Sequence, residues 1–193
     1  MAEVTRALEV ERKYDVELGT ALPELAGRWV VRPPERFGLE ATYVDTADLA
    51  LRRARTTLRR RTGGHDAGWH LKVPAGADRQ ELRLPLQDAL PDQLAALVAD
   101  LVQGRPLGPV VHLATDRTVH VLCDAAGTPL AEVADDRVRA RRLADGSELQ
   151  WREWEVELLG SDRAVLDQVE ALLLAAGARP SSTGSKVGRV LDA

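Results

Sequence analysis

Residues 8–14 read Leu8-Glu9-Val10-Glu11-Arg12-Lys13-Tyr14, a pattern typical of a β-strand. Successive side chains of a strand point to opposite faces, so Glu9, Glu11 and Lys13 share one face. The other face carries Leu8, Val10, Tyr14 and Val16, with Arg12 as its one charge. The charged row is either the solvent side of an open sheet or the lining of an enclosed, charged cavity. The rest of the chain has to distinguish these two interpretations.

The same kind of charged row recurs in later predicted strands. Positions that share a face are Arg59 with Arg61, His70 with Lys72, Arg79 with Glu81 and Arg83, Glu132 with Asp136, and Glu153 with Glu155 and Glu157. A solvated face explains any single row, and we expect such a face for the arginines at positions 137, 139 and 141. Solvated faces usually mix Ser, Thr and Gln with charges of both signs, whereas these rows are nearly pure. Three neighbouring glutamates also repel one another unless cations neutralise them.

The rows together indicate a particular kind of ligand. Carboxylates suit hard divalent ions such as Mg²⁺ or Mn²⁺. Arginine grips phosphate oxygens with two donors, and lysine acts as a point charge. A cavity that holds both sets suits a metal–polyphosphate complex. His70 either points into this cavity or ends its strand, and no spacing of His and Cys suggests zinc.

The composition excludes several other classes of protein. The 193 residues are enough for one domain with a sizeable core, and the net charge of −4 offers no basic field for nucleic acid. The single cysteine, Cys123, allows no internal disulfide. No stretch approaches the ~20 apolar residues of a membrane span. Early charges exclude the apolar core of a signal peptide. We therefore expect a soluble cytoplasmic protein with neither a nucleic-acid nor a membrane partner.

Periodicity predicts many strands and few helices. Strands are expected at residues 8–14, 38–45, 57–62, 69–73, 79–86, 110–123, 130–136, 137–143 and 149–159. Apolar stripes predict helices at 91–102 and 162–176, with shorter helices at 23–29 and 49–53. Residues 180–186 are polar and are expected to be ordered only by contact. The predicted class is α+β: one large antiparallel sheet, open or closed into a barrel, with helices packed outside.

Several short motifs follow one another in a fixed order. They are Glu9-x-Glu11-x-Lys13, Tyr43-Val44-Asp45-Thr46-x-Asp48, Leu58-Arg59-Arg60-Arg61, Leu71-Lys72, Arg79-Gln80-Glu81, Arg117, Glu132-x-x-x-Asp136, Glu153-x-Glu155-x-Glu157-Leu158 and Ser185-Lys186. This ordered set resembles that of the CYTH superfamily, the triphosphate tunnel metalloenzymes. The first motif alone is only moderately specific, but the ordered set is highly specific and covers most of the chain.

The resemblance implies a single CYTH-like domain over residues 1–193, built as an eight-stranded antiparallel β-barrel around a charged tunnel. The tunnel would bind a linear triphosphate, and Mg²⁺ or Mn²⁺ would support hydrolysis of a terminal phosphoanhydride. By position, the substrate-binding residues would be Lys13, Arg59, Arg61, Lys72, Arg79, Arg117 and Lys186. The metal ligands would be Glu9, Glu11, Glu155 and Glu157, with Glu155, Glu157 and Lys72 acting in catalysis. Glu81, Glu132, Asp136 and Glu153 would complete the acidic set or pair with basic side chains.

Several reactions fit this resemblance. We expect hydrolysis of inorganic tripolyphosphate by a monomer or homodimer. Hydrolysis of thiamine triphosphate and cyclisation of ATP, as in class IV adenylate cyclases, use the same architecture. A hypothesis of another kind is a non-catalytic module that binds polyphosphate. The intact row at Glu155 and Glu157 argues against it, and the end of the chain soon after Lys186 predicts no appended helical polyphosphate-binding domain.

Overall fold

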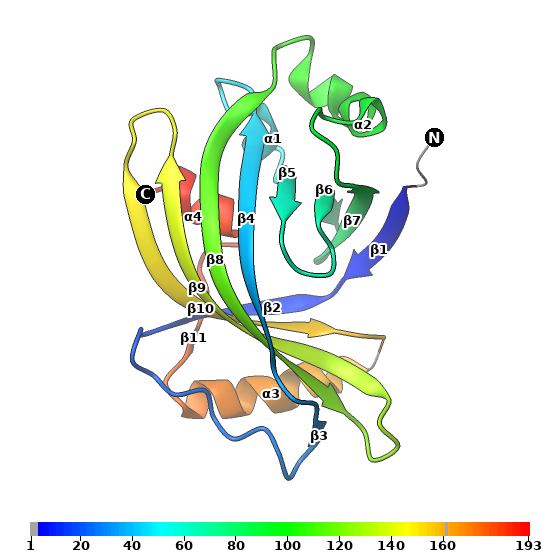
Figure 1. The fold of residues 1–193 in the computed structure, drawn as a ribbon, viewed down its shortest axis with the longest axis vertical. Coiled ribbons are helices and arrows are strands. Elements are labelled where there is room, and N and C mark those ends of the chain that lie inside the picture. Colours follow the sequence, from blue (N-terminus) through cyan, green and yellow to red (C-terminus); the bar gives the residue numbers. More distant parts are fainter. Residues whose placement is uncertain (1–3, 161) are drawn as a thin grey trace.

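Antiparallel strands make up most of the computed structural model, which describes residues 4–160 and 162–193 (Figure 1). The strands are β1 (Thr5–Glu9), β2 (Glu11–Val16), β3 (Val30–Val31), β4 (Glu35–Asp45), β5 (Thr57–Thr62), β6 (Gly68–Ala75), β7 (Asp78–Pro85), β8 (Gly108–Cys123), β9 (Pro129–Arg142), β10 (Glu148–Leu158) and β11 (Arg179–Pro180). The helices are α1 (Ala50–Arg53), α2 (Asp92–Val102), α3 (Ala164–Ala175) and α4 (Lys186–Leu191). The predicted α+β class is confirmed.

The N-terminal stretch closes the sheet. The described strands follow the order β1-β7-β6-β5-β4-β8-β9-β10-β2-β11, and β3 pairs with β8. Leu8 of β1 pairs with Gln80 of β7, whereas Lys13 of β2 pairs with Glu155 of β10. Only Val10 separates β1 from β2, so one stretch of chain forms both sides of the seam of the curled sheet. If β1 and β2 count as one strand and the short β3 and β11 are left out, the described part has the eight strands of the predicted barrel.

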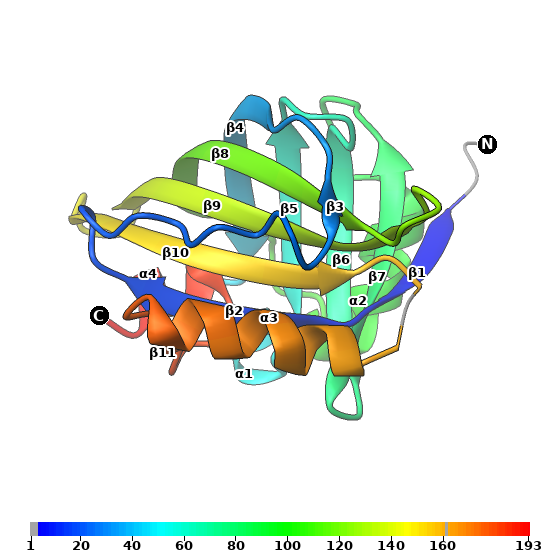
Figure 2. The same cartoon turned by 90° about the horizontal axis from the view of Figure 1, so that it is seen from below.

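Helix α3 covers the outer face of β2 and β10 (Figure 2). Tyr14 and Trp154 are buried in an apolar cluster with residues of α3. Arg12 reaches past Tyr14 and pairs with Asp167 at 2.7 Å and with Glu170 at 3.0 Å, both on α3. Val10, Tyr14 and Val16 of the apolar face therefore pack toward α3, whereas Leu8 is exposed, and the charged face points inward.

Helix α2 covers a second part of the outer face. Its residues Leu94 and Val98 are fully buried with Leu58 of β5 and Leu71 of β6. The preceding short helix α1 begins where the sequence predicts it. Asp45 accepts hydrogen bonds from the main-chain amides of residues 51 and 52, at 2.8 and 2.9 Å, and so satisfies amides that the helix leaves free.

Helix α4 is not among the expected helices, because the expectation for this region concerned only residues 180–186, although Val187, Val190 and Leu191 have helical spacing. The hydroxyl of Ser185 accepts a hydrogen bond from the amide of Gly188 at 3.1 Å and caps the helix. Val187 and Val190 then pack with Tyr43, Leu113 and residues of β9 and β10. Tyr43 and Leu113 also line the central cavity, so α4 packs against the inner face of the curled sheet, whereas the predicted helices all lay outside.

Four further differences from the sequence-based expectations concern element boundaries. Residues 23–29 form no helix, although Leu25 and Trp29 are buried as expected; Gly27 has φ +92°, which interrupts a helix. The strand expected at 8–14 is interrupted at Val10. The two strands expected at 130–143 are the single strand β9, and β6 continues through Pro74 to its turn.

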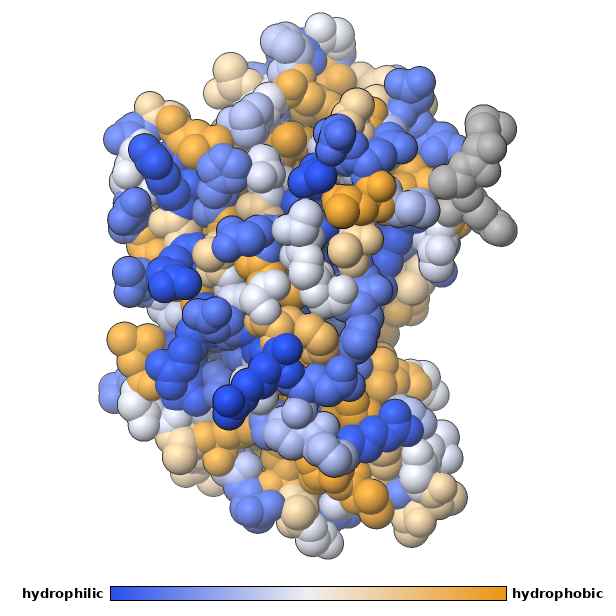
Figure 3. All heavy atoms as spheres, in the orientation of Figure 1, coloured by the Kyte–Doolittle hydropathy of each residue, from blue (hydrophilic) through white to orange (hydrophobic). Residues whose placement is uncertain are grey.

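The outer surface is polar where the sequence predicts it. Arg137, Arg139 and Arg141 of β9 are all exposed. Figure 3 shows hydrophilic residues spread over one face of the molecule, with smaller hydrophobic areas between them. Among the described helices, none is long and apolar enough to cross a membrane.

Candidate active site

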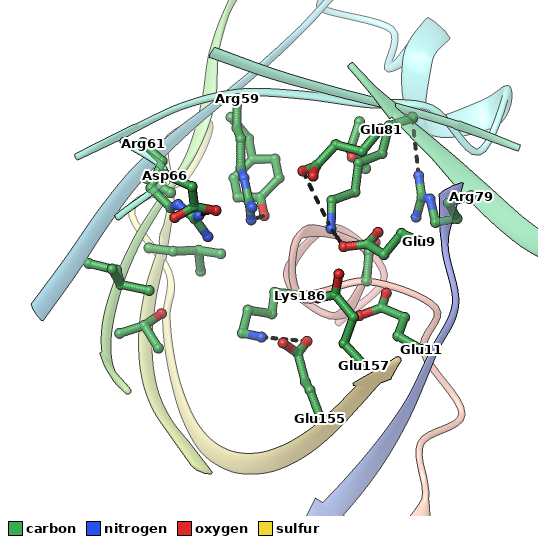
Figure 4. Close-up of a pocket in the computed structure, with 18 of the residues that line it drawn as sticks. Glu9, Glu11, Arg59, Arg61, Asp66, Arg79, Glu81, Glu155, Glu157 and Lys186 are labelled. Atoms are coloured by element: carbon green, nitrogen blue, oxygen red, sulfur yellow. Dashed lines mark hydrogen bonds and ion pairs between the residues drawn. The ribbon is translucent and has the colours of Figure 1, made fainter. Parts of the chain in front are cut away.

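A charged cavity lies inside the curled sheet (Figure 4). Its volume is about 80 Å³, which makes it a narrow space. Strand alternation brings the predicted rows together here, because each row points to the inner face of its strand. The predicted site residues that line it are Glu9, Glu11, Lys13, Arg59, Arg61, Lys72, Arg79, Glu81, Arg117, Glu155, Glu157 and Lys186.

Three arginines present unused donors in this cavity. The Nε atoms of Arg59, Arg61 and Arg79 are buried and have no hydrogen-bond partner within the described part of the chain. Within residues 4–160 and 162–193, Arg79 donates only to main-chain carbonyls, at 2.9 and 3.3 Å. Arg59 donates to the hydroxyl of Tyr43 at 3.1 Å. Burial and the charges of neighbouring arginines lower the pKa of Arg61 to about 9, which leaves it charged at neutral pH. Buried, unpaired donors of this kind call for an anion.

Lys72 connects two of the acidic residues. Its ammonium pairs with Glu9 and lies 3.8 Å from Glu81. Glu81 is also within 2.9 Å of His70 Nδ1, and His70 is 1% exposed and outside the cavity lining. Burial and the charges of Arg59 and Arg61 lower the pKa of His70 to about 4, against the opposing effect of Glu81. His70 is therefore neutral at pH 7 and orients Glu81 from behind.

An ammonium group already occupies the densest cluster of carboxylates. Asp136, Glu153 and Glu155 bring one oxygen each within 4.8 Å of one another, a spacing that would suit a metal ion. Lys186 Nζ lies 2.8 Å from Asp136 and 2.7 Å from each of the two glutamates. We therefore interpret this cluster as the site of the Lys186 ammonium.

Glu155 is further surrounded by cations. Arg117 contacts it at 2.5 Å, and Lys13 pairs with it from the neighbouring strand. Burial alone would raise the pKa of Glu155, but Lys13, Lys186 and Arg117 more than offset this effect and hold the pKa well below its usual value. Glu155 is therefore ionised, and its charge is neutralised by the chain itself.

Glu157 lies in a contrasting environment on the same strand. It has no ion pair among the described residues, and burial together with the charges of Glu9 and Glu11 raises its pKa to about 7, against the opposing effect of Lys72. One oxygen of Glu9, Oε2, is buried without a hydrogen-bond partner in the same part of the structure. Within the described residues, Glu157 and the Oε2 atom of Glu9 thus lack a cation, whereas Glu11 pairs with Lys13 at 2.7 Å and the other oxygen of Glu9 pairs with Lys72. This donor set fits a hard divalent ion.

Three predicted supporting residues lie outside the cavity lining. Asp136 and Glu153 are buried behind it, where Asp136 pairs with Arg117 at 2.6 Å and both contact Lys186. Glu132 is half-buried on β9, directly opposite Glu157 in register. Several lining residues had no role assigned from the sequence, among them Tyr43 and Asp66. Tyr43 shares the inner face of β4 with Leu39, and side-chain alternation in the sequence already indicates this. Asp66 lies in a turn, which has no periodic pattern.

A second cavity adjoins the first. It shares Glu9, Glu11, Lys13 and Arg79 with the charged cavity and has a larger volume, about 390 Å³. Its other walls come from the turn between β6 and β7, from residues 52–57 and from the segment before α4. The charged cavity is therefore approached from the Arg79 end.

Comparisons with known proteins agree with this fold. The CYTH domain matches residues 7–189. Two curated proteins of Mycobacterium tuberculosis, the uncharacterized proteins MT2285 and Rv2226, are each 44% identical over 209 residues. The match covers 97% of this chain and 41% of either relative, so the chain spans about two fifths of their length.

Solved structures show the same architecture at low sequence identity. A protein of Bacillus halodurans named “putative adenylate cyclase” has a TM-score of 0.63 at 18% identity, over 95% of this chain and 97% of its own. The PH1819 protein of Pyrococcus horikoshii has a TM-score of 0.58 at 16% identity, over 95% of this chain and 98% of its own. These likenesses concern the fold alone.

Proposed function

Because this chain belongs to the CYTH domain family, we propose that it is a divalent-metal-dependent triphosphatase and that its substrate is inorganic tripolyphosphate. One observation carries the proposal. The same narrow cavity holds buried guanidinium donors without partners and buried carboxylate oxygens without a cation. A triphosphate with a divalent ion satisfies both sets at once, whereas either ligand alone satisfies only one.

The basic residues form a row along which the phosphate chain would lie. Arg79 stands at the entrance, Arg61 at the opposite end, and Arg59 between them (Figure 4). Their unused Nε donors would face phosphate oxygens. Lys13, Arg117 and Lys186 are already neutralised by carboxylates, so they would contribute through the local field more than through new contacts. Direct contact with the substrate is therefore assigned first to Arg59 and Arg79, and then to the unpaired Nε of Arg61, whose terminal nitrogen pairs with Asp66.

Glu9, Glu11 and Glu157 would hold the metal, with the paired Glu155 beside them. When bound, a divalent ion neutralises phosphate oxygens and acidifies a water molecule. Among the described residues, the Ser185 hydroxyl caps α4, and Cys123 is buried outside the cavity lining, so neither is placed to act as a nucleophile. We infer that water attacks the terminal phosphorus. The arginines stabilise the negative charge that develops on the departing diphosphate.

The adjoining cavity favours a second candidate function. Its volume of about 390 Å³ lies next to Arg79, where the outer end of a bound triphosphate would emerge. An organic group esterified to that end would have space there. Thiamine triphosphate as substrate, or ATP in a cyclisation reaction, fits this arrangement.

A phosphate-release screen tests the proposal. The full chain would be incubated with tripolyphosphate, thiamine triphosphate, ATP and long-chain polyphosphate, each with Mg²⁺ or Mn²⁺ and with EDTA. We expect metal-dependent release that is fastest with tripolyphosphate. Faster turnover of an organic triphosphate, or formation of cyclic AMP, would support the second candidate. Tight binding with no turnover of any compound would indicate a non-catalytic polyphosphate-binding module.

A further inference from the structure

The inner end of the charged cavity is closed by an acidic side chain that the proposed function does not use. Asp66 lies in the turn between β5 and β6, and its carboxylate pairs with the guanidinium group of Arg61. The Arg61 side chain is 7% exposed and that of Asp66 is 33% exposed. Asp66 therefore stands between the cavity and solvent. Figure 4 shows this pair at the end of the cavity away from Arg79.

The turn that carries Asp66 is held tightly in place. Gly63 has φ +79°, and a Cβ atom there would lie 2.1 Å from the carbonyl oxygen of Gly38, so the turn packs directly on the β4 main chain. This close approach positions the Asp66 backbone independently of its ion pair. The closed end is therefore part of the fold.

The carboxylate of Asp66 occupies the Arg61 guanidinium, a group that would otherwise bind an anion. It neutralises Arg61, whose remaining buried donor, Nε, has no partner among the described residues. The same carboxylate lies 3.9 Å from Arg83, another residue of the cavity lining, which pairs with Glu81. A phosphate group that moved past Arg59 would reach Arg61, which is already paired with Asp66. The negative charges of the phosphate and of the Asp66 carboxylate would then repel each other.

We propose that Asp66 is a specificity-determining residue that stops a phosphate chain at Arg61 and so limits how many phosphate units the cavity holds. The inference rests on the proposed function, since it concerns the same cavity and the same class of ligand. If Asp66 is replaced by Ala, both the charge and the bulk of the stop are lost. Arg61 then becomes available to one further phosphate unit, whereas Arg83 stays paired with Glu81. A longer phosphate chain would bind more tightly through this extra contact. Tripolyphosphate would benefit only because Arg61 is no longer paired with Asp66.

The test compares two chain lengths by binding. Isothermal titration in EDTA, which prevents metal-dependent hydrolysis, would measure the dissociation constants of linear tripolyphosphate and linear pentaphosphate. We expect Asp66→Ala to shift their ratio toward the longer chain by about 10-fold or more, the effect of one additional charged hydrogen bond. Asp66→Asn keeps the bulk and removes the charge, so a smaller shift in the same direction is expected.

A control in the same turn separates this effect from loosening of the loop. His65 is exposed and pairs with Glu35 at 2.8 Å, away from the cavity. His65→Ala should leave the ratio within about 2-fold of the wild-type value, a bound smaller than one charged hydrogen bond. An unchanged ratio in both Asp66 variants, with tripolyphosphate still bound, would overturn the inference. If Asp66→Ala fails to fold, the ratio of the two dissociation constants measured for Asp66→Asn tests the inference by itself. Failure of the wild-type protein to bind either chain would instead overturn the proposed function, and this inference with it.

Discussion

Metal binding at the proposed site is expected to weaken below neutral pH because of Glu157. Glu157 lines the cavity, its pKa is raised, and its carboxylate has no ion pair among the described residues. Burial and the charges of Glu9 and Glu11 raise its pKa to about 7 from the ordinary value of 4.5. A carboxylate must lose its proton to bind a divalent ion. Metal and proton therefore compete for the same oxygen atoms.

The size of the effect follows from that pKa. With a pKa of about 7, Glu157 is roughly 97% protonated at pH 5.5 and roughly 9% protonated at pH 8. The apparent affinity for Mn²⁺ should therefore fall about 30-fold between pH 8 and pH 5.5. At pH 6, binding of one ion should release about 0.9 protons from this residue. The affinity rises with pH and levels off above about pH 7.5.

Calorimetric titration of the protein with Mn²⁺ alone measures both quantities. Binding enthalpies in two buffers of different ionisation heat give the number of protons released. Glu157→Gln removes the titrating group and keeps its size, so this variant should bind Mn²⁺ more weakly and with little dependence on pH. Equal wild-type affinity at pH 5.5 and pH 8, or release of no proton at pH 6, would refute the assignment of Glu157 as a metal ligand.

Three other variants have defined expectations. Arg59→Ala should raise the dissociation constant for tripolyphosphate about 10- to 100-fold, because a buried charged donor is lost; an unchanged constant in a titration would remove Arg59 from the binding row. Lys186→Met should lower the free energy of unfolding by about 3–5 kcal/mol in urea denaturation, since three carboxylates lose their shared cation. A loss below about 1 kcal/mol, the size of an exposed pair such as Arg139–Asp116, would contradict this. Gly63→Ala should destabilise the protein by more than Gly127→Ala, because both glycines have positive φ but only the first would place a Cβ atom against a backbone oxygen; equal melting temperatures of the two variants would contradict the close approach of the turn to β4.

Side-chain alternation assigned each charged row to one face of its strand, and the resemblance carried by the ordered motifs predicted that these faces line one cavity. Glu9, Glu11 and Lys13 could be assigned to one face because a strand fixes that face once its register is known. The two long helices were equally predictable, since their apolar stripes match outer faces of the sheet. Helix α4 could not be predicted in this way, because it is short and depends on the Ser185 cap and on contacts made by Val187 and Val190.

The sequence also could not predict that Glu155 and Glu157 differ in their ion pairs and in their pKa values. Both residues lie on the same face of β10 and belong to the same motif. Only the folded chain brings Lys186 and Arg117 to Glu155 and leaves Glu157 with other carboxylates. The position of Asp66 in the cavity was not predicted for a related reason. A turn residue has no periodic pattern, and Asp66 reaches Arg61 only because the turn folds back toward β5.

The central claim is that one cavity holds both the triphosphate and the metal that supports its hydrolysis. The most direct measurement pairs phosphate release from tripolyphosphate in Mn²⁺ with binding of tripolyphosphate in EDTA, for the wild-type protein and for Glu157→Ala. We expect metal-dependent release by the wild type, loss of release in the variant, and a dissociation constant in EDTA that is little changed. Unaltered turnover in Glu157→Ala would show that the metal does not act from this cavity.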